Sequence, residues 1–219
     1  MNSTNIFDYR YYYKRYLPHI QPIEAIMFVT YSIKFEYPKK FYIDLKRRKE
    51  DFLKFLKNIQ KEDRKEKIYN FNKIQFDITD NFLAKYTNSP KWLNNTQIAG
   101  IIKDSLFYKH KKEYNLICYC IMPNHVHILI RPLLKTKDKP YSITSIMKNH
   151  KSYTAVKSNK VLRRKEQFWH HGSYDHYIRN EEEFHNVIRY ILNNPVKAGL
   201  IRNYEDWKFK WVYEETIQL

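Results

Sequence analysis

Two histidines two positions apart are the sharpest chemical feature of the sequence. His125 and His127 alternate with apolar residues over the run 125–130. Successive side chains of a strand point to opposite faces, so the two imidazoles would share one face while the apolar residues face a core. Two imidazoles on one face can chelate a divalent cation. Two polar residues on the solvated face of an amphipathic strand would produce the same spacing.

A tyrosine followed by an amide one helical turn later is the second feature. The run 181–192 predicts a helix whose buried stripe is formed by apolar residues at 184, 187, 188 and 191. Tyr190 falls at the edge of that stripe, and Asn194 follows at i+4. A nucleophile beside a metal ligand is one interpretation, and an ordinary amphipathic tyrosine with a packed ring is the other.

Phosphoryl chemistry would join the two features. A tyrosine is a poor nucleophile at neutral pH and needs a polarised phosphorus to attack. A cation held by His125 and His127 would act as a Lewis acid on a phosphate, and Asn194 would be a third ligand that leaves positions open. Imidazole and amide-oxygen ligands together suit Mg²⁺ or Mn²⁺, and Zn²⁺ is compatible with them.

The composition favours a polyanionic partner. The 219 residues include 40 Lys and Arg against 23 Asp and Glu, a formal net charge of +17. Nucleic acid is the leading partner because its phosphates are densely spaced, and a solvated lysine-rich surface is the alternative. With only three glycines, a doubly wound fold with glycine-rich phosphate loops is disfavoured. Cys118 and Cys120 are too few for a disulfide framework and fit a core strand better than a metal site.

The elements that must position these residues give an α+β pattern. Strands are expected at 25–33, 116–122 and 125–131, the last two as a hairpin, and within 168–178. Helices are expected at 40–67, 95–109, 142–156 and 181–192, with 157–165 as a basic loop and 68–94 without clear organisation. Asn194-Pro195 and Gly199 are expected to stop the last helix.

This order predicts a sheet with helices packed on one face. The absence of an internal repeat or a flexible linker favours a single domain over 1–219, with a basic helical insertion near 38–90. No apolar run approaches the length of a membrane span, and no secretion signal is recognisable, so no membrane partner and a cytoplasmic location are expected.

Four blocks of the sequence resemble one family. A histidine, a hydrophobic residue and a second histidine after Met122-Pro123-Asn124 resemble the HUH superfamily of single-strand DNA nucleases and transposases. The blocks 16–19 with 28–30, 168–181 and 190–200 resemble the REP-associated tyrosine transposases, in the same order. The insertion near 38–90 has no counterpart in that resemblance.

The resemblance implies a ferredoxin-like α+β fold with the histidines on a central strand of an antiparallel sheet and the tyrosine on a C-terminal helix. It implies His125 and His127 as metal ligands, Asn194 as a candidate third ligand and Tyr190 as the nucleophile. The implied reaction is attack by Tyr190 on single-stranded DNA at hairpin-associated sites, leaving a 5′-phosphotyrosine and a free 3′-hydroxyl. The implied partner is single-stranded or hairpin DNA with REP-like palindromes, bound by a monomer or a homodimer.

Alternatives stand beside this interpretation. Tyr174 is the reserve nucleophile, and a domesticated hairpin-binding protein without cleavage activity and a water-activating metal hydrolase are the rival functions. DNA contacts are expected from basic and aromatic residues, although a solvated or core role is open for several of them, Trp169 above all. These residues are Arg10, Lys14, Arg15, Lys148, Lys151, Arg163, Arg164, Trp169, Asp175 and His176.

Overall fold

The computed structural model describes residues 11–14 and 20–213. The chain divides into two compact units, one formed by residues 1–34 and 90–219 and the other by residues 35–89. The smaller unit covers nearly the same residues as the basic helical insertion expected near 38–90. The expectation of a single domain over 1–219 stays a prediction.

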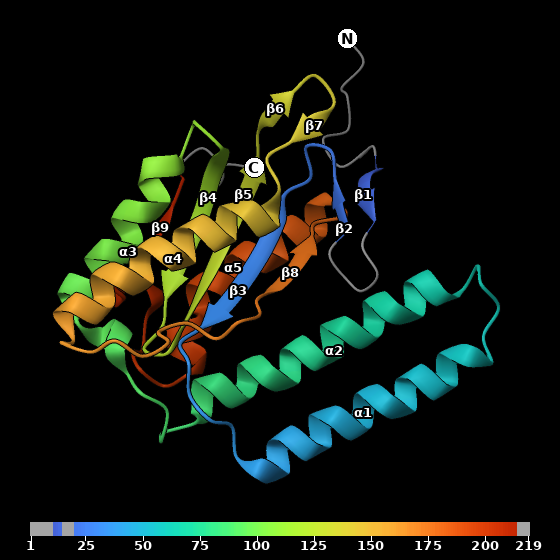
Figure 1. The fold of residues 1–219 in the computed structure, drawn as a ribbon, viewed down its shortest axis with the longest axis horizontal. Coiled ribbons are helices and arrows are strands. Elements are labelled where there is room, and N and C mark those ends of the chain that lie inside the picture. The colour runs from blue at the N-terminus through green and yellow to red at the C-terminus, as the bar shows by residue number, and fades with distance from the viewer. Residues whose placement is uncertain (1–10, 15–19, 214–219) are drawn as a thin grey trace. The chain divides into compact units, whose positions relative to one another are not determined.

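The larger unit is built on a five-stranded antiparallel sheet with the strand order β8-β3-β5-β4-β9 (Figure 1). The strand that carries the two histidines, β5, lies at the centre, as predicted. The strands are β3 (Met27–Ser32), β4 (Tyr114–Ile121), β5 (His125–Pro132), β8 (Tyr174–Tyr177) and β9 (Lys210–Val212).

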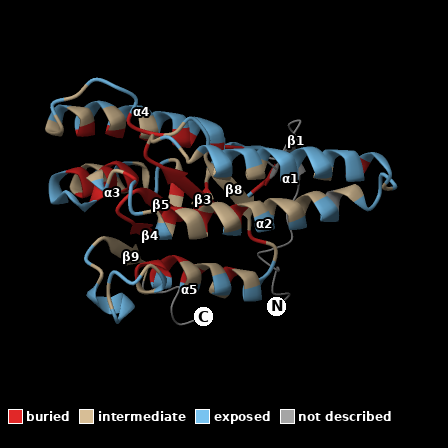
Figure 2. Cartoon of the chain, turned by 90° about the horizontal axis from the view of Figure 1, so that it is seen from below, coloured by how far each residue is buried: buried red, intermediate tan, exposed pale blue. Residues whose placement is uncertain are grey.

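Helices of the larger unit lie on both faces of this sheet. Helices α3 (Thr96–Lys109) and α4 (Ile143–Val161) cover one face, and α5 (Glu181–Lys197) covers the other (Figures 1 and 2). The chain order β3-α3-β4-β5-α4-β8 with this strand order is the ferredoxin-like arrangement, so the predicted α+β class is confirmed. The prediction that the helices pack on one face was wrong in one respect: α3 and α4 share a face, whereas α5 covers the opposite face, where the histidines lie.

Short elements complete the described residues. β1 (Tyr11–Lys14) pairs with β2 (Ile20–Pro22), and β6 (Leu134–Thr136) pairs with β7 (Lys139–Pro140). Two short 3₁₀ helices are η1 (Trp92–Asn94) and η2 (Tyr204–Asp206). Within the described ranges, none of the helices combines the length and the apolar composition needed to cross a membrane.

A buried polar network fixes α4 on the sheet. The Tyr31 hydroxyl of β3 lies 2.7 Å from His150 Nε2, and the Ser105 hydroxyl of α3 lies 2.9 Å from His150 Nδ1. Burial lowers the pKa of His150 to about 3, so the imidazole is neutral at physiological pH. His150 is therefore a satisfied core histidine that joins one strand and two helices.

Two helix ends differ from the sequence prediction. α4 continues to Val161, so part of the predicted basic loop 157–165 is helical. α5 continues through Pro195 to Lys197 instead of stopping at Asn194-Pro195. Proline lacks an amide hydrogen and its ring crowds the carbonyl four residues earlier, so it weakens a helix at that point. Here only two residues of the helix follow Pro195, so the loss is confined to its last turn.

A Schellman motif ends α5. The Gly199 amide donates to the Val196 carbonyl and the Leu200 amide to the Pro195 carbonyl, both at 2.9 Å. Gly199 has φ +69°, a left-handed conformation that glycine adopts at low cost. The glycine predicted to stop this helix does so, four residues after the proline.

The smaller unit is a pair of helices, α1 (Lys39–Lys57) and α2 (Arg64–Lys85). Aromatic rings join them: the ring centroids of Phe41 and Phe82 are 4.0 Å apart, and those of Phe52 and Phe71 are 3.9 Å apart. The prediction of one helix over 40–67 was wrong, because the chain turns between residues 58 and 63. The run 68–94, which the sequence left unorganised, mostly forms α2.

Glycine substitutions at the two helices test this account of helix termination. We expect Gly199→Ala to lower the free energy of unfolding by about 1 kcal/mol, because the Cβ of alanine makes the left-handed conformation unfavourable. No atom lies within 4 Å of the added Cβ at either glycine, so the effect comes from the backbone alone. Gly100→Ala, inside α3, is expected to stabilise by about 0.5–1 kcal/mol. The measurement is the midpoint of urea unfolding for each variant. Midpoints that move in the same direction for both variants would contradict this account of helix termination.

Candidate active site

Strand pairing places the two histidines. β3 and β5 are antiparallel neighbours, with Ser32 opposite His125 and Thr30 opposite His127. Both histidines are fully buried, so a solvated strand face does not explain their spacing. They lie on the sheet face that α5 covers, because the Tyr190 ring of α5 contacts the His127 ring.

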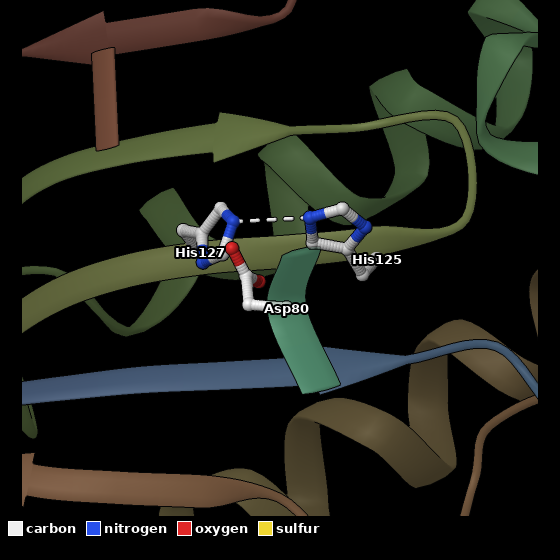
Figure 3. Close-up of side chains that lie close together, drawn as sticks. All are labelled: Asp80, His125 and His127. Atoms are coloured by element: carbon white, nitrogen blue, oxygen red, sulfur yellow. Dashed lines mark hydrogen bonds between the residues drawn. The ribbon is translucent and has the colours of Figure 1, made fainter. Parts of the chain in front are cut away.

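The two imidazole rings approach each other with their Nε2 atoms. His125 Nε2 and His127 Nε2 are 3.0 Å apart, the contact drawn as a dashed line in Figure 3. The other nitrogens are held by neighbours: His125 Nδ1 donates to Asn124 Oδ1 at 2.6 Å, and His127 Nδ1 lies 2.7 Å from the Thr30 hydroxyl. Partners on Nδ1 orient an imidazole so that Nε2 can serve as a ligand.

This geometry fits a divalent cation. With Nδ1 of His125 protonated, its Nε2 carries a lone pair, and a 3.0 Å approach to a second Nε2 needs a proton or a cation between the two atoms. Two imidazole nitrogens bound at right angles to a metal, at about 2.1 Å each, would lie about 3.0 Å apart. The same separation is that of a hydrogen bond between the two rings, and both nitrogens belong to a donor set that suits a divalent cation.

Tyr190 meets this pair from the helix. Its ring centroid lies 5.7 Å from that of His127 and 6.1 Å from that of Phe28, edge-on to both. Its side chain is half-buried, between the buried stripe of α5 and solvent, as the helical spacing predicts. Lys197, two turns later on α5, holds its ammonium 5.2 Å from the centre of the tyrosine ring. The Tyr190 phenol, the two imidazoles and the Lys197 ammonium thus lie close together on one face of the sheet.

Asn194 and Tyr174 lie on the same side of the sheet. Asn194 is fully buried one turn after Tyr190, and its place among the metal ligands stays a prediction. Tyr174 pairs with Thr30 across β8 and β3, and its ring is 6.1 Å from Phe28. Of the two tyrosines, Tyr190 has the ring contact with His127, and the assignment of either as the nucleophile stays a prediction.

His176 connects β8 to the first turn of α5. His176 Nε2 lies 2.8 Å from Glu183 Oε1, and Glu183 Oε2 accepts from the Arg179 amide at 2.8 Å. Asn180 caps the helix by accepting from the Glu183 amide. His176 therefore helps to position the helix that carries Tyr190, and its expected contact with DNA stays a prediction.

Lys151 also has an internal role. Its ammonium donates to the carbonyl oxygens of His170, His171 and Gly172 at 2.6, 3.3 and 3.1 Å. Burial lowers the pKa of Lys151 to about 8. The segment it holds continues the sheet beyond β8, because the His170 amide donates to the Ser32 carbonyl. Lys151 thus connects α4 to the end of the sheet where His125 lies.

The other expected DNA contacts divide into internal, exposed and undescribed residues. Trp169 is buried and donates to the Thr154 hydroxyl at 2.9 Å, and the Arg164 guanidinium stacks on Trp92 at 4.1 Å. Asp175 faces away from the histidines, whereas Lys148 and Arg163 are exposed. Lys14 lies in β1, and Arg10 and Arg15 lie outside the described residues.

Sequence reasoning missed the residues that support the site. Thr30 and Phe28 come from a strand about a hundred residues earlier, and only the pairing of β3 with β5 brings them to His127. Asn124 directly precedes His125, so its proximity was a signal available from the sequence. Figure 3 also labels Asp80 of α2, a buried carboxylate in the smaller unit that the sequence did not single out.

Comparison with known proteins defines the class. Residues 87–194, which span β4, β5, α4, β8 and most of α5, match the family model described as "Transposase IS200 like". This segment is therefore similar to the IS200-like transposases, and the family resemblance seen in the sequence is confirmed.

Individual relatives are REP-associated tyrosine transposases. A Haemophilus influenzae protein assigned to that group is 24% identical over 168 residues, which cover 74% of this chain and 88% of the relative. The REP-associated tyrosine transposase of Escherichia coli K12 is 22% identical over 135 residues, covering 62% and 76%. The solved structure of a REP-associated tyrosine transposase bound to a REP hairpin is similar with TM-score 0.49 and 14% identity, over 91% of this chain and 81% of that one.

The two lysines of α4 give a matched test of the internal role of Lys151. We expect Lys151→Met to lower the melting temperature by about 2–6 °C, because three carbonyl contacts are lost. Lys148→Met removes an exposed lysine and is expected to change it by less than about 1 °C. A different result would identify Lys151 as a phosphate contact instead. In that case Lys151→Met would leave the melting temperature unchanged and would reduce the slope of log affinity for DNA against log salt concentration by about one.

Proposed function

We propose that this chain is a metal-dependent DNA strand transferase with Tyr190 as its nucleophile. The observation that carries the proposal is the contact of the Tyr190 ring with His127, one of two imidazoles whose Nε2 atoms lie 3.0 Å apart. The family match over residues 87–194 supports it independently. The substrate would be single-stranded DNA beside a hairpin.

The reaction would exchange one phosphoester for another. The Tyr190 phenol oxygen attacks the phosphorus, a bond between that oxygen and phosphorus forms, and the bond from phosphorus to the 3′-oxygen breaks. The phenol proton leaves to solvent, and the departing 3′-oxygen takes up a proton. Since the phosphotyrosine keeps the energy of the broken ester, a second DNA 3′-hydroxyl can reverse the step without ATP.

His125 and His127 would hold the cation, with Asn194 as the candidate third ligand. Mg²⁺ and Mn²⁺ are the ions we propose, and when bound such an ion withdraws electron density from the phosphate and stabilises the charge that develops on it. Thr30 and Asn124 fix the imidazole rings, so the ligand atoms need no rearrangement to receive it.

DNA is the partner that the charge and the relatives support. The net charge of +17 favours a polyphosphate, and the matched relatives are assigned to REP-associated transposases. Exposed Lys148 and Arg163 remain proposed phosphate contacts. A monomer or a homodimer in the cytoplasm, where it meets DNA, is part of this proposal.

A denaturing-gel assay tests the nucleophile. Labelled single-stranded hairpins are incubated with wild type, Tyr190→Phe and Tyr174→Phe, each with Mn²⁺ or with EDTA. We expect a denaturant-resistant protein–DNA adduct only with Mn²⁺, in wild type and Tyr174→Phe, and a loss of at least about 10³-fold in Tyr190→Phe because no nucleophile remains. Phenylalanine keeps the ring contacts, so hairpin binding is expected to persist.

The other outcomes separate the rival functions. Cleavage without an adduct would identify a hydrolase that activates water at the histidines. Hairpin binding with neither cleavage nor adduct would identify a domesticated binding protein. An adduct that survives in Tyr190→Phe and disappears in Tyr174→Phe would move the nucleophile to Tyr174.

A further inference from the structure

The inserted unit of residues 35–89 carries a charged surface that the proposed reaction does not use. α1 contains eight basic and three acidic residues, a net charge of +5 within one helix. Its apolar side is occupied inside the unit, because the Phe41 and Phe52 rings stack on rings of α2 and Leu56 is buried. The opposite side of α1 faces solvent.

Five basic residues of α1 form one line on that opposite side. At about 100° per residue, they fall within a sector of roughly 100°, centred about 180° from the sector of Phe41, Phe52 and Leu56. All five are exposed. We call this line the basic stripe; it consists of Lys39, Lys40, Arg47, Lys54 and Lys57.

The basic stripe is long enough to meet several phosphates. Lys40, Arg47 and Lys54 recur every seven residues, about 10.5 Å along the helix, and the stripe from Lys39 to Lys57 is about 27 Å long. Double-stranded DNA carries about one negative charge per 1.7 Å of its axis, counted over both strands, so a stripe of this length can meet several phosphates.

Acidic neighbours moderate this charge without cancelling it. Asp44 lies 3.5 Å from Arg47, and Asp51 lies 3.8 Å from Lys54. Both pairs are exposed, with the Arg47 and Lys54 side chains 70% and 78% accessible. Exposed ion pairs contribute little in water, so a phosphate can take the place of either carboxylate.

We propose that the basic stripe of α1 binds the phosphate backbone of the DNA substrate. The inserted unit would then be an electrostatic contact surface that adds affinity without reading the base sequence. This inference rests on the proposed function, since it names the part of the chain that holds the same DNA.

The test compares two variants of the full-length chain with equal charge loss. The stripe variant replaces the five stripe residues with glutamine, and the control variant replaces five exposed lysines of the same unit that lie off the stripe. The control residues are Lys49, Lys61, Lys67, Lys73 and Lys85. Far-UV circular dichroism checks that both variants keep their helices.

Binding is measured by fluorescence anisotropy with a labelled DNA hairpin that carries a single-stranded 5′ extension, between about 50 and 200 mM salt. The slope of log affinity against log salt concentration is expected to be smaller in magnitude by about three to five for the stripe variant than for wild type. The stripe variant should also bind at least tenfold more weakly. The control is expected to lose less than about one from the slope. A variant with Lys39, Lys40, Lys54 and Lys57 changed to arginine should bind as wild type does.

Two different results would overturn different claims. Equal losses in the stripe and control variants would show that the stripe is a solvated face and that only total charge matters, while the proposed function stands. Failure of the wild-type chain to bind the hairpin at all would overturn the proposed function, and the stripe assignment with it.

Discussion

The close approach of two imidazole nitrogens inside a buried sheet is the constraint on which the site depends. Two Nε2 atoms 3.0 Å apart need a proton or a cation between them, and the fold keeps them there by holding both Nδ1 atoms. The pairing of β3 with β5 sets this arrangement. A slip of one residue in that register would turn Thr30 away from His127 and move the apolar residues of β5 out of the core.

The helix that carries Tyr190, α5, is fixed to the same sheet face by contacts at both ends. Asn180, Glu183 and His176 define where α5 begins beside β8, and Gly199 defines where it ends. Between these ends, Phe28 supports both Tyr190 and His127. A side chain on a helix held in this way keeps its position relative to the two imidazoles, which a loop would not ensure.

The sequence predicted what depends on local pattern. Alternation placed His125 and His127 on one strand face, and helical spacing placed Tyr190 at the edge of the buried stripe of α5. The order of elements gave an α+β class, whereas the ferredoxin-like arrangement was implied by the family resemblance. Contacts between distant segments were not predictable. The internal contacts of Lys151, Trp169 and His176 depend on carbonyl, hydroxyl and carboxylate partners that other elements bring to them, so the sequence did not predict these contacts. Their part in DNA binding stays a prediction. The turn between α1 and α2 was missed because charged helix-forming residues continue through it.

The most direct measurement of the central claim is a crystal structure of the protein soaked with Mn²⁺, with anomalous data collected to locate the ion. The account predicts a single strong anomalous peak within about 2.0–2.3 Å of both His125 Nε2 and His127 Nε2, on the side of the sheet that carries Tyr190. The peak should vanish in His127→Ala while Tyr190→Phe keeps it. No peak between the two imidazoles, at an Mn²⁺ concentration that supports DNA cleavage, would contradict the account.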